Sequence, residues 1–339
     1  MELKRVGIDL AKNVFQIHGV DGAEKPVLRK ALRRSQMLTF FAQRPPMLIG
    51  MEACGSSHYW ARELSRQGHT VKLIAPQFVK AYVKSGKNDA NDAEAICEAV
   101  SRPSMRFVEI KNAEQQAALA VHRVRERIVR GRTALVNEIR GLLAEYGIVI
   151  SKLGGSAVRR ALAEILEDAE NGLPSSFRLL LNELRSELES HDERLLHLNR
   201  QLDDQVKSDE RVQRLMALEG VGPVTATAIV ASVGDARHFK SGRDFAAWLG
   251  IVPNQHSSGG KARLGKISKR GDRYLRTLLI HGARSVVLSS VNKTDRRSEW
   301  IRALTQRRNK NIATVAVANK QARIIWALLS RGDSYRKAA

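Results

Sequence analysis

Four carboxylates in the first hundred residues have types and spacing suited to holding metal ions. Asp9 lies within GIDLAK, Glu52 within MEACG, and Asp89 and Asp92 within KNDANDA. Apolar neighbours predict strands around Asp9 and Glu52, whereas the spacing of Asp89 and Asp92 places both on one helix face. Carboxylate oxygens are the ligands that Mg²⁺ prefers, with Mn²⁺ as a possible substitute, and paired ions stabilise both reacting oxygens in phosphoryl transfer.

Each of these carboxylates also has an ordinary structural interpretation. A single Asp in a strand is commonly a turn or edge residue, and an Asp pair at a helix start commonly caps the helix. The combination favours catalysis, because an acid inside an apolar strand is costly unless something pairs with it. Glu94 and Glu98 continue the same helix and are expected to be solvated, whereas Asp21 before Gly22 is expected to form a turn.

A second candidate for chemistry lies far along the chain, in HSSGGKARLGKISKRGDRYLR at 256–276. Ser257 and Ser258 precede two glycines, which allow the backbone to approach a phosphate. A serine hydroxyl needs activation at neutral pH, and its phosphate must be held in line. Ser258 is the favoured nucleophile because it directly precedes glycine, and Ser257 is the alternative. Cations that could neutralise phosphates around this turn are Lys261, Arg263, Lys266, Lys269, Arg270 and Arg273.

The charge of the chain indicates a polyanionic partner. The 339 residues carry a net charge of +22, and the sequence pI is about 10.5. Residues 240–339 alone hold 22 basic and 5 acidic side chains, a net charge of +17. Nucleic acid is the simplest partner, although a solvated basic loop or a membrane surface would also satisfy this charge.

Other sequence features narrow the class of protein. We find no run of 18 apolar residues and no signal peptide, so no membrane association is expected. The two cysteines, Cys54 and Cys97, cannot form a disulfide framework, and no Cys/His cluster has zinc spacing. These features are typical of a protein of the reducing cytoplasm.

Residues 1–110 are predicted to form an α/β domain that positions the four carboxylates. Alternating and apolar runs predict strands at 5–11, 13–20, 25–32, 46–53 and 69–76. Amphipathic patterns predict helices at 35–44, 58–68 and 89–102. The order of these elements is typical of three layers, with a sheet between helices.

The rest of the chain is predicted to be helical. Residues 111–210 contain two long helices, at 113–147 and about 177–208. Their near-heptad stripes indicate an antiparallel helical hairpin or a dimerising coiled coil, with two core-packed helices as the alternative. Residues 211–330 form a mainly helical domain, and residues 331–339 form a tail that is expected to be disordered. The Gly220-Val221-Gly222 turn within this domain predicts a helix-hairpin-helix that contacts a DNA backbone, with simple helix packing as the alternative.

The motifs together resemble a known family. GIDLAK, MEACG and KNDANDA are similar to the RNase H-like (RuvC-type) domain of the DEDD transposases of bacterial insertion sequences. WLGIVPNQHSSGGKARLGKISKRGDRYLRTLLIHGA is similar to the C-terminal transposase domain of the same family. The resemblance covers nearly the whole chain, in the same order.

The resemblance implies a mechanism and a set of partners. It implies Mg²⁺ bound by the four acids, and a serine that attacks a DNA phosphate to give a covalent phosphoserine link and a free 3′ hydroxyl. It also implies DNA partners at the element ends and target, a structured guide RNA, a dimer that becomes a tetramer on DNA, and a place at the bacterial nucleoid. The alternatives are a metal-dependent junction resolvase or nuclease without a covalent intermediate, and a non-catalytic nucleic-acid-binding protein.

Overall fold

A computed structural model describes residues 2–84, 86, 88–152 and 154–335 of the chain. The chain divides into two compact units, Met1–Glu114 and Gln115–Ala339. The first unit is a mixed α/β domain built on one sheet, and the second is mostly helical, as the sequence predicts. None of the helices in the described part combines the length and the apolar character needed to cross a membrane.

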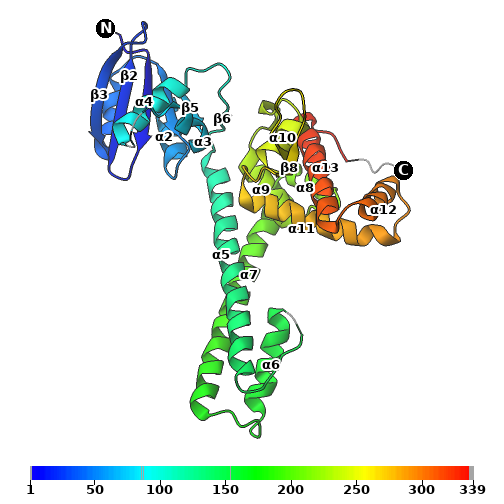
Figure 1. The fold of residues 1–339 in the computed structure, drawn as a ribbon. Coiled ribbons are helices and arrows are strands. Elements are labelled where there is room, and N and C mark those ends of the chain that lie inside the picture. The colour runs from blue at the N-terminus through cyan, green and yellow to red at the C-terminus, as the bar shows by residue number, and fades with distance from the viewer. Residues whose placement is uncertain (1, 85, 87, 153, 336–339) are drawn as a thin grey trace. The chain divides into compact units, whose positions relative to one another are not determined.

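The first unit is built on a six-stranded sheet with the order β3-β2-β1-β4-β5-β6 (Figure 1). Strand β1 pairs antiparallel with β2 and parallel with β4, and β4 pairs parallel with β5. The five predicted strands are therefore confirmed, whereas β6 was not predicted because two residues show no periodicity. The bounds are β1 Arg5–Leu10, β2 Val14–Val20, β3 Pro26–Arg33, β4 Leu48–Glu52, β5 Thr70–Ile74 and β6 Phe107–Val108.

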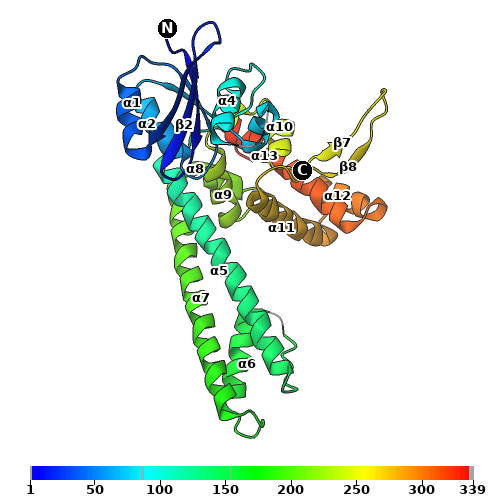
Figure 2. The same cartoon turned by 60° about the vertical axis from the view of Figure 1, so that its left-hand side comes forward.

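Helices cover both faces of this sheet (Figure 2). Helices α1 (Met37–Ala42) and α2 (Ser57–Arg66) bury their apolar side chains with those of β1 and β4 on one face. Helix α4 (Asp89–Ala99) packs on the other face, after the short helix α3 (Pro76–Val79). The three-layer arrangement is thus confirmed, and α4 carries two of the four candidate acids.

Two glycines allow α4 to lie directly on the sheet. A Cβ atom at Gly7 would lie 2.2 Å from the Ala93 carbonyl oxygen and 2.3 Å from the Cys97 backbone nitrogen. A Cβ atom at Gly50 would lie 2.8 Å from Val100 Cβ. Gly7 and Gly50 are register partners on β1 and β4, so together they form a flat seat for the helix.

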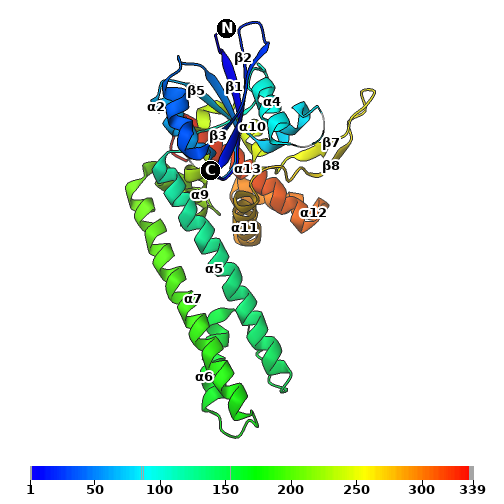
Figure 3. The ribbon, with the colours of Figure 1, turned by 90° about the vertical axis from the view of Figure 1, so that its left-hand side faces the viewer.

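The second unit begins with a pair of long helices, α5 (Ala113–Ala144) and α7 (Ser175–Ser208), joined through α6 (Gly155–Glu167). They run antiparallel and side by side (Figure 3), because Arg125 Nε donates to Asn199 Oδ1 at 2.8 Å while Arg132 pairs with Asp192. Apolar side chains of all three helices form one buried cluster. The pair therefore packs within one chain, and a dimerising coiled coil remains a proposal.

The remaining helices surround a core of their own and carry a β-hairpin. The bounds are α8 Glu210–Met216, α9 Pro223–Val233, α10 Gly242–Trp248, β7 Pro253–Gln255, β8 Leu264–Ile267, α11 Arg273–Ser289, α12 Arg296–Arg307 and α13 Lys310–Arg331. The first residue of the predicted tail, Arg331, is still helical, because α13 ends only at Gly332 in the left-handed conformation. Residues 336–339 of that tail lie outside the described residues.

A buried histidine joins α5 to this core. His122 Nδ1 lies 3.1 Å from the Tyr274 hydroxyl of α11, and His122 Nε2 lies 3.1 Å from Thr227 Oγ1 of α9. Burial lowers the pKa of His122 to about 4, so the imidazole stays neutral near pH 7. Both ring nitrogens have a partner, which fixes α5 relative to the helices on either side of the hairpin.

We expect Gly7→Ala to loosen α4. The added methyl group would push the helix away from β1, and overpacking of this kind costs about 1–3 kcal/mol. Hydrogen–deuterium exchange of the amides in 89–99 should therefore be faster in the variant. Gly55→Ala is the matched control, because a Cβ atom there meets nothing within 4 Å. Unchanged exchange in Gly7→Ala would contradict the seat described above.

Candidate active site

Asp9 and Glu52 lie side by side on the face of the sheet that α4 covers. The parallel register of β1 and β4 places Ile8 beside Met51. The next residue of each strand, Asp9 on β1 and Glu52 on β4, therefore lies beside the other. Because side chains alternate along a strand, Asp9 shares a face with Gly7, and Glu52 shares a face with Gly50. That is the face on which α4 is seated.

Asp89 and Asp92 lie in the first turn of α4, at the end of the helix that approaches Asp9. The direction follows from two contacts of Cys97: its backbone lies against Gly7, and its Sγ donates to the Arg5 carbonyl at 3.8 Å. Later residues of α4 therefore lie toward the start of β1, and earlier residues lie toward its end. The helix is capped by Asn88, whose side chain accepts from Asn91 N at 2.8 Å, so neither Asp is the N-cap residue.

The four carboxylates interact electrostatically. Asp9 is half-buried, and the pKa of its carboxyl is raised to about 6, first by burial and then by the negative charges of Asp89, Asp92 and Glu52. Negative charges that raise the pKa of a neighbouring acid are stabilised by a bound cation, so this group of carboxylates favours a cation. In the part of the chain that the structure describes, no three His, Cys, Asp or Glu side chains are grouped closely enough to hold a metal ion as they stand.

The neighbouring acids, Glu94 and Glu98, form ion pairs with basic side chains. Glu94 lies 3.4 Å from Arg29 and 3.6 Å from Lys84, and Glu98 lies 3.2 Å from Lys84. The prediction that Glu94 and Glu98 are simply solvated was therefore wrong, because both are half-buried and form ion pairs. The turn at Asp21 is confirmed: its Oδ1 accepts from two backbone N–H groups at 2.9 and 3.0 Å.

The serine segment of the second unit forms a β-hairpin, which projects from the helices of that unit in Figures 2 and 3. Gly259 and Gly260 have φ angles of 55° and 75°, and Lys261 N donates to the Ser258 carbonyl at 3.1 Å. Positive φ at both central residues is typical of a type I′ hairpin turn, which favours glycine. Ser258 is thus the last residue before the turn at the tip.

The two serines differ in their hydrogen bonds. Ser257 Oγ accepts from Gln255 Nε2 at 2.9 Å and from Arg263 N at 3.3 Å, so it helps to hold the two strands together. The Ser258 hydroxyl is exposed and has no hydrogen bond with any described residue. Of the two hydroxyls, that of Ser258 is available to react without a change in the hairpin.

Close backbone contacts hold the base of the hairpin. A Cβ atom at Gly250 would lie 2.7 Å from Gly271 N, and one at Gly271 would lie 2.0 Å from the Trp248 carbonyl oxygen. Ser268 N donates to the Val252 carbonyl at 2.8 Å, and Lys269 N donates to the Gly250 carbonyl at 3.0 Å. These contacts tie the ends of the hairpin to α10 and α11.

The cations predicted to bind nucleic acid lie along the hairpin and at the start of α11. All six are exposed, and none of them forms an ion pair with a residue in the described ranges. They are Lys261, Arg263, Lys266, Lys269, Arg270 and Arg273. An unpaired cationic surface of this kind suits a phosphate backbone.

The glycines of the Gly220-Val221-Gly222 turn have different environments. A Cβ atom at Gly220 would lie 2.6 Å from the Gly282 carbonyl oxygen of α11, and Gln321 Nε2 donates to the Glu219 carbonyl at 2.7 Å. Helix packing therefore accounts for Gly220. Gly222 is exposed and is the N-cap residue of α9. A Cβ atom at Gly222 would meet nothing within 4 Å.

Comparison with known proteins agrees with both halves of this arrangement. A family model described as "Transposase" matches residues 6–148, and one described as "Transposase IS116/IS110/IS902 family" matches residues 212–299. The chain is 59% identical over 336 residues to the "Probable family 20 transposase" of Pseudomonas aeruginosa, covering 99% of each chain. The chain belongs to the DEDD transposases of insertion sequences.

Two further relatives cover nearly all of the transposase. It is 46% identical over 338 residues to the transposase for insertion sequence element IS1111A of Coxiella burnetii, covering 100% of this chain and 93% of that one. It is 42% identical over 332 residues to the transposase for insertion sequence element IS1328 of Yersinia enterocolitica, covering 98% of each. The protein is therefore a DNA transposase, an enzyme that acts on DNA.

A DEDD domain implies dependence on a divalent metal ion, and the donor chemistry of the four candidate residues suits such an ion, although in the described part of the chain their side chains are not yet close enough to share it. All four candidate ligands are carboxylates, which are hard oxygen donors. Asp9 and Glu52 lie near the ends of neighbouring strands, and Asp89 and Asp92 lie in the first turn of α4. The pKa of Asp9 is raised first by burial and then by the negative charges of the other three. A divalent cation would remove that repulsion.

Sequence reasoning missed the glycines that bring these acids together. Gly7 and Gly50 each lie two residues before an acid on the same strand, and this spacing puts glycine and acid on one face. The repeated Gly-x-acid pattern, in GID and GME, is the signal that could have located both the seat of α4 and the site.

We expect Asp9→Asn to stabilise the metal-free transposase at pH 8. The pKa of Asp9 is about 6 in the folded state and about 3.8 in the unfolded state, so its ionisation disfavours the fold. This cost is absent below about pH 4, grows as pH rises, and is complete above about pH 6. In EDTA, the unfolding temperature of the variant should exceed that of wild type at pH 8, and the difference should vanish toward pH 4.

Glu2→Gln is the control for this experiment, because Glu2 is an exposed carboxylate of the same unit. The unfolding temperature of Glu2→Gln should stay close to that of wild type at both pH values. A higher unfolding temperature for wild type than for Asp9→Asn at pH 8 would show that Asp9 is held by a stabilising partner and not by like charges.

Proposed function

We propose that the transposase cuts and joins DNA strands with an RNase H-like (RuvC-type) acidic site and a serine nucleophile, Ser258. The observation that carries this proposal is the hairpin tip, where an exposed serine hydroxyl without a hydrogen-bond partner is surrounded by exposed cations. Ser257 is the alternative nucleophile, although its hydroxyl already accepts two hydrogen bonds.

The proposed cleavage step conserves atoms and charge. Ser258 Oγ attacks a DNA phosphorus and loses its proton, while the bond from phosphorus to the 3′ oxygen breaks and that oxygen gains a proton. The product is a phosphoserine link to one strand and a free 3′ hydroxyl on the other side of the cut. Attack of a 3′ hydroxyl from the exchanged strand on the phosphoserine restores the serine and rejoins the DNA, so no external energy source is required.

The proposed metal ligands are Asp9, Glu52, Asp89 and Asp92, with Mg²⁺ as the ion and Mn²⁺ as a possible substitute. A bound ion supplies stabilisation of negative charge on the phosphate oxygens. Around the scissile phosphate, the cations of the hairpin would neutralise neighbouring phosphates. The exposed N-terminus of α9 at Gly222 offers backbone N–H groups to a phosphate, and Gly220 supports that turn from within the core.

The proposal includes a structured guide RNA and a homo-oligomer at the nucleoid of the bacterial cytoplasm. The net charge of +17 in residues 240–339 exceeds what one short DNA contact needs, which leaves room for a second polyanion. In such systems, base pairing reads the sequence while the protein holds backbone. The exposed apolar residues of the long helices, such as Leu179 and Leu196, support a dimer that becomes a tetramer on paired DNA.

A covalent adduct is the decisive test of this chemistry. Purified transposase, Mg²⁺ and labelled DNA that carries the element junction, with or without the adjacent non-coding transcript, should give a slow, protease-sensitive band on a denaturing gel. Ser258→Ala and Asp9→Asn should each reduce the band by at least about 10³-fold, because each removes an essential group. Ser257→Ala should retain most of the adduct.

Two outcomes would change the proposal. Cleavage without an adduct would make the protein a metal-dependent resolvase or nuclease, and the serine hairpin would then only bind phosphate. An adduct that persists in Ser258→Ala and is lost in Ser257→Ala would move the nucleophile by one residue. Dependence of the band on the transcript would identify the guide.

A composite site formed by two subunits predicts complementation. Asp9 lies in the first unit and Ser258 in the second, so the two groups of one active site can come from different chains of an oligomer. Mixing Asp9→Asn with Ser258→Ala subunits should restore about a quarter of wild-type cleavage. About half of the dimers are then mixed, and one of the two sites in each mixed dimer combines an intact acid with an intact serine. No recovery after verified subunit exchange would assign both groups to one chain.

A further inference from the structure

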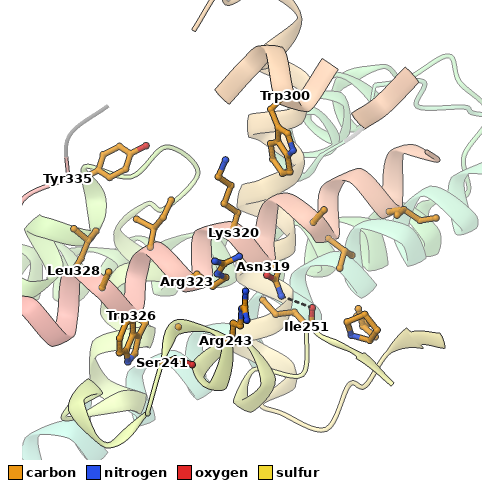
Figure 4. Close-up of a pocket in the computed structure, with 18 of the residues that line it drawn as sticks. Ser241, Arg243, Ile251, Trp300, Asn319, Lys320, Arg323, Trp326, Leu328 and Tyr335 are labelled. Atoms are coloured by element: carbon orange, nitrogen blue, oxygen red, sulfur yellow. Dashed lines mark hydrogen bonds between the residues drawn. The ribbon is translucent and has the colours of Figure 1, made fainter. Parts of the chain in front are cut away.

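The second unit contains a groove whose lining residues, apart from Lys266, take no part in the proposed cleavage chemistry. It has a volume of about 1560 Å³ and follows the exposed face of α13 (Figure 4). The base of the hairpin, with Pro253 and Lys266, lines one part of it. The start of α10 with Arg243 and helix α12 with Trp300 line others.

The groove gathers cations that lack acidic partners. Arg243 and Arg323 lie next to each other although they come from α10 and α13. Neither of them, nor Lys320, forms an ion pair with any residue in the described part of the chain. Burial and the positive charges of neighbouring arginines lower the pKa of Lys320. Such mutual repulsion is relieved by an anionic ligand.

The same groove offers flat apolar surfaces. Lys320 Nζ lies over the Trp300 ring, 4.4 Å from its centre, and both side chains face the groove, so a base that stacks on this ring face takes the place of the cation. Trp326 is fixed in its wall, because its Nε1 donates to the Ala236 and Phe239 carbonyls at 3.1 and 3.2 Å. A ligand that combines stacking rings with negative charge fits this surface better than a simple anion.

Nucleic acid with exposed bases has both properties. In a duplex the base faces are covered by neighbouring pairs, whereas an unpaired strand presents them to aromatic side chains. Stacking on an aromatic side chain contributes about 1–3 kcal/mol per base, largely independent of sequence. The pairing of Trp300 with the arginines of α10 and α13 is therefore typical of a site for an unpaired strand.

We infer that this groove binds an unpaired DNA strand, with a base against Trp300 and phosphates against Arg243 and Arg323. The hairpin supplies the reason for DNA. Its strands line the groove and lead from Pro253 to Ser258 over about 17 Å, at 3.3–3.4 Å per residue. This location next to a cleaved strand rests on the proposed function, whereas binding in the groove does not.

The test measures binding of a fluorescent 12-nucleotide oligo-dT to the full-length transposase by anisotropy, without Mg²⁺, over a range of salt. Trp300→Ala should weaken binding by about 5- to 160-fold, since one base loses its stacking surface. Trp300→Phe keeps a ring and should lose much less. The double variant Arg243→Gln/Arg323→Gln should weaken binding and reduce the slope of log K against log salt by about 1.4.

Arg307→Gln/Arg308→Gln is the matched control, because it makes the same charge change at exposed arginines of the same unit that do not line the groove. Circular dichroism of every variant excludes unfolding. Equal losses in the control and the groove variants, or no loss in Trp300→Ala and in Arg243→Gln/Arg323→Gln, would overturn the inference. Stronger and Trp300-dependent binding of oligo-U would overturn it in favour of an RNA strand.

Ser258→Ala separates this inference from the proposed function. The variant should bind oligo-dT as wild type does, because Ser258 lies at the far end of the hairpin from the groove. Failure of the adduct test with intact, Trp300-dependent binding would leave the groove in place while removing the serine chemistry.

Discussion

The close contact between α4 and the β1–β4 pair is the constraint on which the first unit depends. Gly7 and Gly50 are register partners without side chains, so the backbone of α4 lies directly on Gly7 and the Val100 side chain lies directly on Gly50. Asp9 and Glu52 each follow one of these glycines by two residues on the same strand. The contact that buries Ala93 and Cys97 therefore also fixes the distance of Asp9 and Glu52 from the first turn of α4. The geometry of the site is thus a consequence of packing and not of the acids themselves, which repel one another.

The second unit uses the same device to hold its hairpin. Backbone contacts at Gly250 and Gly271 fix the base, and the contact between Gly220 and Gly282 fixes the turn beneath α11. His122 then joins α5 to α9 and α11 through two hydrogen bonds in the interior. The base of the hairpin is held by close backbone contacts, while its tip is exposed.

Local patterns in the sequence predicted most elements of both units. Alternating and apolar runs identified β1 to β5, and the apolar stripes identified α5 and α7. An element that buries one face has apolar residues at a regular spacing, and this spacing is visible in the sequence. Strand β6 and the hairpin were not predicted. A strand of two residues and a hairpin whose side chains are mostly exposed show no hydrophobic period in the sequence. The side-by-side position of Asp9 and Glu52 depends on strand pairing, and the environment of Gly220 depends on Gly282, sixty residues away, so neither follows from local sequence. The groove beside α13 was missed for the same reason, since its walls come from four separate elements.

The hairpin has a consequence for how this family can diversify. Its strands bury almost no side chain between Pro253 and Ile267, and its turn needs only two residues that accept positive φ. Adding one residue to each strand together would lengthen the arm by about 3.3 Å and turn the terminal serine to the opposite face, whereas adding two would lengthen it by about 7 Å and restore the face. The reach of the serine is therefore adjustable in discrete steps, without any change to the helices that carry it. One helical scaffold that carries hairpins of different length therefore suits relatives whose DNA strands are spaced differently.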